Sequence, residues 1–226
     1  MQINSPQELA PFVQHTLIKP GVTHDQIVAH AEEAVAHNFG AVMVPASWVR
    51  EVAAVVKGTD VQVASALDFP TVGVMTSYGK AREAESIAKA GADQIDIGVQ
   101  IGWLKSGRDD DFRSDIAGVV EASGLPIKVM LELPLLTDGE KERAVELSMD
   151  AGVKWLKNAS SGAIETANPQ SVRFLVERAR EGVLVKASGA ITAYDQAVAL
   201  VEAGASALGT SAGLELVQGD SASASY

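Results

Sequence analysis

The 226-residue chain has no cysteine, which excludes disulfides, thiol catalysis and zinc–thiolate sites. Basic residues are scarce as well: 18 lysines and arginines stand against 29 aspartates and glutamates, for a formal net charge of −11. Proteins that bind nucleic acid or a membrane surface rely on basic patches, so neither is expected as a partner. No apolar run approaches the ~20 residues of a membrane span, and the N-terminus has no basic segment leading into an apolar one. We therefore expect a cytoplasmic protein that acts on a small molecule.

What the sequence has instead is a regular alternation of helical and β-branched segments. Helical segments end at Gly40, Gly91, Gly152 and Gly204, and a short apolar run follows each of them. Glycine there supplies the left-handed residue with which many helices end. Strands are expected near residues 13–19, 40–44, 61–67, 93–97, 126–132, 153–157, 183–186 and 205–208. Helices are expected near residues 23–38, 46–57, 76–90, 109–123, 138–150, 168–181 and 192–203, with a short one after 211.

Eight α/β units in about 200 residues favour one (β/α)8 barrel, that is, a TIM barrel, because strands separated by helices pair in parallel. An open doubly wound sheet is the alternative, but the dinucleotide-binding pattern GxGxxG does not follow the first strand. We assign residues 1–217 to a single barrel domain. Residues 218–226, rich in serine and alanine, are expected to form a flexible C-terminal tail.

Two lysines carry the chemical prediction. Lys157 ends the apolar run 153–157, Lys186 ends the run 183–186, and small residues follow both. Burial at a strand exit and a second nearby cation both lower the pKa of an amine, which makes it nucleophilic at neutral pH. The alternative for either lysine is a strand-end residue whose amine reaches solvent. Two of them on neighbouring strands favour a Schiff-base site.

Further ionisable residues fall at expected strand ends, namely Lys19, Asp68, Asp96 and Glu132. Asp96 is expected to point into the barrel, because the residues before and after it are isoleucines that would face the helices. A buried carboxylate beside two lysines is a candidate proton shuttle; an ion pair that only neutralises one lysine is the alternative. Lys128 is expected to be a structural charge partner of Asp96 or Glu132.

Turns of small residues follow the last three expected strands, at 158–162, 187–190 and 209–213. Exposed backbone N–H groups, hydroxyls and the N-terminus of a following short helix can together bind a phosphate without arginine. Loops after the last two strands of such barrels commonly bind phosphate. These turns are therefore the predicted phosphate site.

The four histidines do not form a metal site. His24, His30 and His37 lie on the first helical segment at spacings of six and seven, without the i, i+4 pairing of metal ligands, and are expected to face solvent. His15 lies on a strand and is expected to be a structural histidine.

In these motifs the chain resembles the deoxyribose-phosphate aldolase family of class I aldolases, over essentially its whole length. The segment WLKNASSG at 155–162 resembles the family's VKTSTG, but has one residue more between the lysine and the glycine. The other matching segments are HTLIKP at 15–20, GADQID at 91–96, IKVMLE at 127–132, VKASGAIT at 185–192 and LGTSAG at 208–213.

The resemblance implies a lyase that reversibly cleaves 2-deoxy-D-ribose 5-phosphate into acetaldehyde and D-glyceraldehyde 3-phosphate, without a metal or an organic cofactor. Lys157 would form the Schiff base, Lys186 would lower its pKa, and Asp96 would relay protons. The residues implied in phosphate binding are Ser160 or Ser161 with Gly162, Gly189 and Ala190, and Gly209, Thr210 and Ser211. Some family members have a similar tail ending in tyrosine that reaches the site, so we expect the same of Tyr226; a disordered end is the alternative.

The chain departs from the family pattern at several positions. Gln14 stands where the family has Asp, Met43 where it has Cys, Pro45 where it has Asn, Ala190 where it has Gly, and Ala212 where it has Ser. The pocket wall and part of the phosphate site therefore differ. A related Schiff-base aldolase for another sugar phosphate and a catalytically silent phosphosugar-binding barrel stay as alternatives, and a homodimer is left open.

Overall fold

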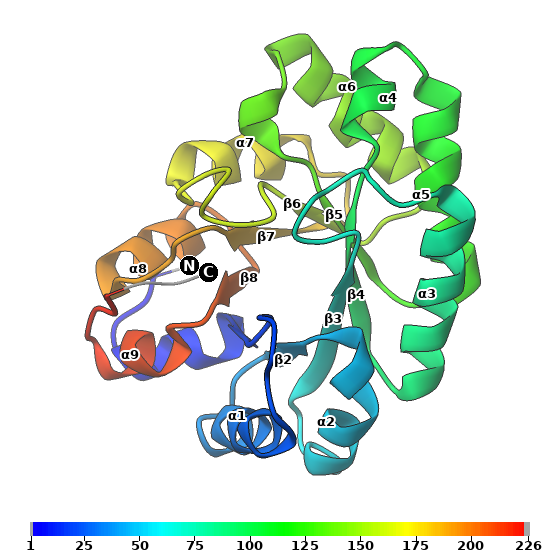
Figure 1. The fold of residues 1–226 in the computed structure, drawn as a ribbon. Helices are drawn as coiled ribbons and strands as arrows, with labels where there is room; N and C mark the ends of the chain where they lie inside the picture. Colours follow the sequence, from blue (N-terminus) through cyan, green and yellow to red (C-terminus); the bar gives the residue numbers. More distant parts are fainter. Residues whose placement is uncertain (1, 224–226) are drawn as a thin grey trace.

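Eight parallel strands form a closed barrel in the computed structural model, which describes residues 2–223. Each strand pairs with the next in chain order, and β8 pairs with β1, so the ring closes (Figure 1). The strands are β1 (Val13–Thr16), β2 (Ala41–Val44), β3 (Gln62–Leu67), β4 (Gln94–Gly98), β5 (Ile127–Met130), β6 (Trp155–Lys157), β7 (Leu184–Ser188) and β8 (Ala207–Thr210). The predicted (β/α)8 barrel is confirmed, and the open doubly wound sheet is excluded.

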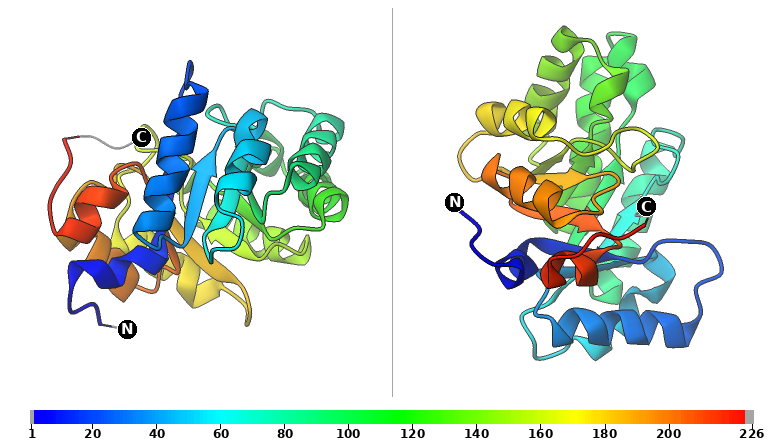
Figure 2. Two further views of the ribbon diagram at one scale, coloured as in Figure 1. Left: turned by 90° about the horizontal axis from the view of Figure 1, so that it is seen from below. Right: turned by 90° about the vertical axis from the view of Figure 1, so that its left-hand side faces the viewer.

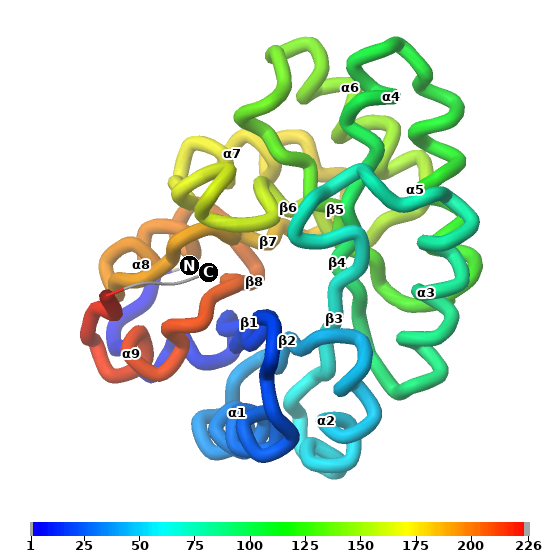
Figure 3. Tube along the Cα trace, in the orientation of Figure 1, coloured from blue at the N-terminus to red at the C-terminus, as the bar shows by residue number. Residues whose placement is uncertain are grey.

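Helices surround the strands, and the colour order in Figure 3 follows the chain once around the ring. The helices expected from the sequence are α1 (His24–Ala36), α2 (Val49–Val55), α3 (Ser77–Ala90), α5 (Asp109–Ser123), α6 (Asp138–Asp150), α7 (Pro169–Arg178), α8 (Tyr194–Glu202) and α9 (Gly213–Gln218). Within residues 2–223, none of the helices has both the length and the apolar character needed to cross a membrane.

η2 (Ala46–Trp48) forms the start of the helix expected at 46–57, directly before α2. Other short helical segments were not expected: η1 (Pro6–Phe12), α4 (Ile101–Lys105) and η3 (Leu133–Leu135). Each is too short for a helical period to appear in the sequence. η1 lies beside α9 in both views of Figure 2, so residues from the two ends of the chain pack together.

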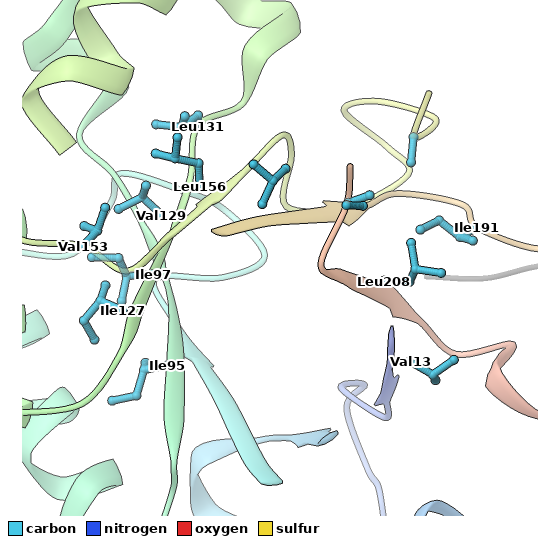
Figure 4. Close-up of a cluster of buried hydrophobic side chains, with 14 of the residues drawn as sticks. Val13, Ile95, Ile97, Ile127, Val129, Leu131, Val153, Leu156, Ile191 and Leu208 are labelled. Carbon is cyan, nitrogen blue, oxygen red and sulfur yellow. The ribbon is translucent and has the colours of Figure 1, made fainter. Parts of the chain in front are cut away.

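The barrel wall separates two kinds of side chain. Aliphatic residues of the strands, among them Ile95, Ile97, Val129 and Leu156, are fully buried in the large core cluster shown in Figure 4. The residue between the two isoleucines, Asp96, instead points into the barrel and contacts Lys128 on the neighbouring strand β5 and Lys186 on β7. The alternation expected for residues 93–98 is confirmed.

Three of the four expected helix-ending glycines have the left-handed conformation, with φ of 106° at Gly91, 92° at Gly152 and 107° at Gly204. The fourth prediction is wrong, because Asn38 takes that role with φ 53°. Gly40 is needed for another reason: a Cβ there would lie 2.1 Å from the carbonyl oxygen of Pro11.

The described part of the expected tail is held against the β7–α8 loop. The backbone N–H of Ala222 donates to the carbonyl of Thr192 at 2.8 Å, and Ser221 forms an antiparallel bridge with Ala193. The flexibility of residues 218–226 stays a prediction, and Tyr226 lies outside the described residues.

His30 is half-buried, so the expectation that it faces solvent is wrong. Its ring stacks on His15 with the centroids 3.9 Å apart, and its Nε2 lies 3.1 Å from the His15 carbonyl oxygen. His15 in turn is buried, with its Nε2 2.7 Å from Oε1 of Glu33, as expected for a structural histidine. Burial, together with the nearby His15, lowers the pKa of His30 to about 3.

This pKa predicts how stability depends on pH. Below pH 6.5 the unfolded chain protonates His30 while the folded chain does not, so stability is lost as the pH falls toward about 3. The variant His30→Gln cannot take up this proton. Between pH 7 and pH 4 we expect it to lose about 1–3 kcal/mol less unfolding free energy than the wild type, measured by urea unfolding. Equal losses in the two proteins would contradict the buried, neutral His30.

Candidate active site

Strand register brings the predicted catalytic residues together inside the barrel: Lys157 is the last residue of β6, whereas Asp96 and Lys186 lie in the middle of β4 and β7. Lys157 on β6 is paired directly with Lys186 on β7. Asp96 on β4 is paired in the same way with Lys128 on β5. Because the strands are parallel and curve into a closed ring, the two pairs face each other inside the barrel.

The Asp96 carboxylate is the centre of this arrangement. Its Oδ2 lies 2.8 Å from Nζ of Lys186 and 3.0 Å from Nζ of Lys157, and its Oδ1 lies 3.3 Å from Nζ of Lys128. The side chains of Asp96, Lys128 and Lys186 are fully buried, and Lys157 is 3% exposed. We call these four residues the lysine–aspartate cluster. Asp96 thus contacts both Lys157 and Lys186, and not only one of them. Its expected pairing with Lys128 is confirmed.

The cluster contains more positive than negative charge, and its electrostatics follow from that. Burial by itself would raise the pKa of Asp96, but the ammonium groups of Lys186, Lys157 and Lys128 outweigh it and hold that pKa well below its usual range. Burial lowers the pKa of Lys128 to about 7, although the attraction of Asp96 opposes the shift. The cluster is therefore able to release a proton near neutral pH while its carboxylate stays ionised.

Glu132 fixes the loop that follows Lys157. It adopts a left-handed conformation, with φ 50°, where β5 ends earlier than expected. Its Oε1 accepts a hydrogen bond from the backbone N–H of Ser160 at 2.9 Å. Burial raises the pKa of Glu132, although the hydrogen bonds from Ser160 oppose the rise. The N–H of Ser160 is thus engaged with a carboxylate, whereas Ser161 and Gly162 are partly exposed.

The turns after β6 and β7 touch each other. A Cβ on Gly162 would lie 2.9 Å from Cβ of Ala190, so only glycine allows the close approach. Ala190 has φ 46°, a conformation that is strained for alanine, at a position where the resembling family has glycine. Gly189 and Ala190 therefore lie next to Gly162, as the predicted phosphate site requires.

Hydrogen bonds of the Thr210 side chain stabilise the turn after β8. The Thr210 hydroxyl donates to the carbonyl of Ile191 at 2.7 Å and accepts from the backbone N–H of Ala212 at 2.9 Å. Gly209 is buried at the end of β8, and Ser211 is exposed. The structure thus gives Thr210 a supporting role in this turn and leaves Ser211 at the surface.

Two of the strand-end residues singled out in the sequence lie away from the lysine–aspartate cluster. Lys19 borders a cavity of about 280 Å³ that His30 and Glu33 also line. Asp68 accepts hydrogen bonds from the backbone N–H groups of residues 73–75, and Lys80 lies 3.5 Å from its carboxylate. Asp68 therefore organises the loop between β3 and α3.

Lys80 was missed in the sequence. It is fully buried, and its Nζ donates to Asp115 at 2.5 Å and to the carbonyl of Gly98 at 2.9 Å. Its spacing from the buried Ala84 and Ile87 places it on the apolar face of α3. This spacing could have indicated from the sequence that Lys80 is buried.

Two departures from the family pattern lie inside the barrel. Gln14 donates to Oε1 of Gln94 at 3.0 Å, so an amide pair stands where the family pattern has a carboxylate. Met43 forms a small apolar cluster with Ala41 and Ala64. Within residues 2–223, histidine and carboxylate side chains form no group of three or more that is placed to hold a metal ion.

The charge balance of the cluster predicts the effect of removing its carboxylate. Asp96→Asn leaves buried ammonium groups without a counter-ion, which should lower the free energy of unfolding at pH 7 by about 3–5 kcal/mol. The deficit should shrink toward pH 10, because the folded variant then binds fewer protons than the unfolded chain. Urea unfolding at several pH values measures both effects. The matched control, Asp150→Asn, breaks an ion pair with Arg180 at the surface and should cost less than about 1 kcal/mol. A loss of less than about 1 kcal/mol in Asp96→Asn as well would contradict the placement of Asp96 as the counter-ion of the buried lysines.

Comparison with known proteins agrees with the fold. The chain is 38% identical over 220 residues to the deoxyribose-phosphate aldolase of Staphylococcus carnosus, covering 97% of this chain and 100% of the relative. It is 36% identical to that of Methanothermobacter thermautotrophicus, over 97% and 98% of the two chains. No family model matches.

Solved structures give the same result. The tetrameric deoxyribose-phosphate aldolase of Aeropyrum pernix superposes with a TM-score of 0.86 at 27% identity, covering 96% of this chain and 92% of that one. An aldolase named QR15 superposes with a TM-score of 0.86 at 25% identity, over 93% and 95% of the two chains. With relatives well above 30% identity over nearly its full length, the chain belongs to the deoxyribose-phosphate aldolase family.

Proposed function

We propose that this protein reversibly cleaves 2-deoxy-D-ribose 5-phosphate into acetaldehyde and D-glyceraldehyde 3-phosphate through an imine on Lys157. The observation that carries the proposal is the position of Lys157, a buried amine at a strand exit that shares one carboxylate oxygen with Lys186. The names of the relatives support the same reaction.

In the proposed reaction, the neutral amine of Lys157 attacks the aldehyde carbon C1 of the open-chain sugar. Loss of water gives a protonated imine, which can accept an electron pair. Removal of the proton from the C3 hydroxyl then breaks the bond between C2 and C3. The electron pair moves into the imine to give an enamine, and glyceraldehyde 3-phosphate leaves. Protonation at C2 and hydrolysis of the imine release acetaldehyde and restore the amine.

Lys186 and Asp96 have different proposed tasks in these proton transfers. The positive charge of Lys186 favours the neutral form of the adjacent Lys157 amine, which is the nucleophilic form. The low pKa of Asp96 keeps it ionised at neutral pH, so it is suited to accept hydrogen bonds rather than to store a proton. We propose that Asp96 takes part in the predicted proton relay by aligning the amines and water, and that the proton itself passes through the amine of Lys186.

We propose that the turns after β6, β7 and β8 bind the phosphate. Support comes from the contact between Gly162 and Ala190 and from the exposure of Ser211. Among the candidates Ser160 and Ser161, the engagement of the Ser160 N–H with Glu132 favours Ser161. Gly189 allows the carbonyl oxygen of Glu165 to lie 2.0 Å from the position that a Cβ would take, which fixes the turn after β7. Gly209 remains a proposed phosphate-binding residue, and Thr210 supports the last turn.

The remaining partners are proposed from composition. Sugar phosphates and aldehydes are the proposed ligands, and nucleic acid and membranes are not, because the chain has a formal net charge of −11. A cytoplasmic location agrees with the lack of cysteine. Tyr226 keeps its proposed role in proton transfer at the acetaldehyde-derived carbon, although it lies outside the described residues.

Reduction of the imine tests the nucleophile. Acetaldehyde with borohydride should leave a reduced two-carbon adduct on Lys157, located by peptide mass spectrometry, and Lys157→Ala should lose both adduct and turnover. Lys186→Leu should lower kcat on the order of 100-fold at pH 7, and less at higher pH, where Lys157 needs no neighbouring cation to be neutral. An adduct on Lys186 alone would reverse the two assignments. A chain with no adduct would be a silent phosphosugar-binding barrel.

A charge placed in the last turn tests the phosphate site. Ser211→Asp should raise KM for deoxyribose 5-phosphate at least about tenfold through repulsion, and should change KM for unphosphorylated deoxyribose little. Ser211→Ala, which removes the hydroxyl without adding a charge, is the matched control and should raise the KM for deoxyribose 5-phosphate much less than Ser211→Asp does. Steady-state kinetics with both sugars measure the difference. Equal losses on both substrates would place the phosphate elsewhere.

A further inference from the structure

We infer that Asn158 and Glu165 form a positioning pair that holds Lys157 in place against Lys186. The inference rests on the proposed role of Lys157 as the nucleophile. Neither residue is a catalytic candidate in the sequence, and Asn158 differs from the threonine that follows the lysine in the family motif.

Asn158 continues the pairing of β6 and β7 beyond the end of β6. The last backbone pair of the two strands is Lys157 with Lys186. One residue further, the buried side chain of Asn158 takes over: its Oδ1 accepts from the backbone N–H of Ser188 at 2.9 Å, and its Nδ2 donates to the Ser188 carbonyl at 3.0 Å. An amide side chain thus makes the two hydrogen bonds that a neighbouring strand would make.

Glu165 determines which way this amide faces. Its Oε2 accepts from Nδ2 of Asn158 at 2.6 Å. A carboxylate is an acceptor only, so Nδ2 must point to Glu165 and Oδ1 is left for the N–H of Ser188. The other carboxylate oxygen of Glu165, Oε1, accepts hydrogen bonds from Nδ2 of Asn168 at 3.0 Å and from the hydroxyl of Ser171. Asn168 is the N-cap of α7, so the pair is anchored to a helix end.

The pair adds support on the β7 side directly after the strand pair of Lys157 with Lys186. On the β5 side, backbone hydrogen bonds already hold the strand end: Leu131 N–H to the Lys157 carbonyl and Leu133 N–H to the Asn158 carbonyl, both at 3.0 Å. The loop that follows is one residue longer than the family pattern and has no regular structure until α7 begins at Pro169. Without the Asn158 amide, residue 158 would lose both of its side-chain hydrogen bonds to Ser188 on β7. The backbone of Lys157 could then shift relative to Lys186 and Asp96.

Side-chain variants at the two positions test this. Asn158→Leu keeps the approximate volume but removes every hydrogen bond, and Asn158→Thr introduces the family residue. Glu165→Gln keeps an acceptor for Asn158, whereas Glu165→Ala removes it. Ser65→Ala is the matched control, because it removes a buried hydroxyl that donates to the carbonyl of Val44 at 2.9 Å between β3 and β2, away from the lysines.

Three quantities are measured for each protein: unfolding in urea, the rate at which acetaldehyde forms a borohydride-reducible imine on Lys157, and kcat and KM for deoxyribose 5-phosphate. In Asn158→Leu we expect imine formation and kcat to fall at least about 30-fold with KM within about threefold, because orientation of the nucleophile is lost while phosphate binding is kept. Asn158→Thr and Glu165→Ala should fall about tenfold, and Glu165→Gln should stay within about threefold. Ser65→Ala should lose stability but keep the wild-type imine rate.

The outcomes separate the two proposals. A wild-type protein that forms no imine on Lys157 would overturn the proposed function and this inference with it. If the wild type forms the imine and Asn158→Leu forms it equally fast, only the positioning role is wrong. Should Asn158→Leu fail to fold, the two Glu165 variants decide, because they leave Asn158 in place: equal imine rates in Glu165→Ala and Glu165→Gln would overturn the inference.

Discussion

The active site depends on one carboxylate, Asp96, that faces the amines of Lys128, Lys157 and Lys186 inside the barrel. A buried ion costs several kcal/mol unless an opposite charge compensates it, and one carboxylate cannot compensate every ammonium group around it. Burial lowers the pKa of Lys128 to about 7 although Asp96 opposes the shift, and the positive charges of Lys186 and Lys157 add to it, so loss of a proton near neutral pH is favoured. An aldolase that works through an imine needs an amine in its neutral form, and this charge imbalance is a physical route to it.

Strand register and the size of the inward-facing side chains determine where the charged residues lie inside the barrel. Lys157 pairs directly with Lys186, and Asp96 with Lys128, and the two pairs are offset by two residues in the register of β5 and β6. On β2 and β3 the interior is occupied by the small apolar cluster of Ala41, Met43 and Ala64. The lysine–aspartate cluster is thus built from β4 to β7, and the small-residue turns after β6, β7 and β8 are the proposed phosphate site.

Much of this arrangement was predictable from local patterns, and the rest depended on contacts distant in sequence. Lys157 and Lys186 stand out because each ends an apolar run, and Asp96 because isoleucines flank it. Nothing local shows that Asn158 bonds to Ser188, 30 residues away, or that His30 stacks on His15. Gly40 looked like a helix-ending glycine, but it is required by the approach of Pro11 from the preceding segment. Hydrophobic patterns with a period of two or 3.6 residues predict strands, helices and their buried faces. Contacts between residues distant in sequence form only when the barrel closes.

The central claim, that the buried lysine–aspartate cluster releases a proton near neutral pH, can be observed directly. Lysine labelled with ¹³C at Cε reports the protonation of each amine by NMR as the pH is varied. The account predicts one buried lysine signal that titrates near pH 7 and is missing from the spectrum of Lys128→Met. A titration in which every lysine stays protonated up to about pH 10, the range of an unperturbed amine, would contradict it.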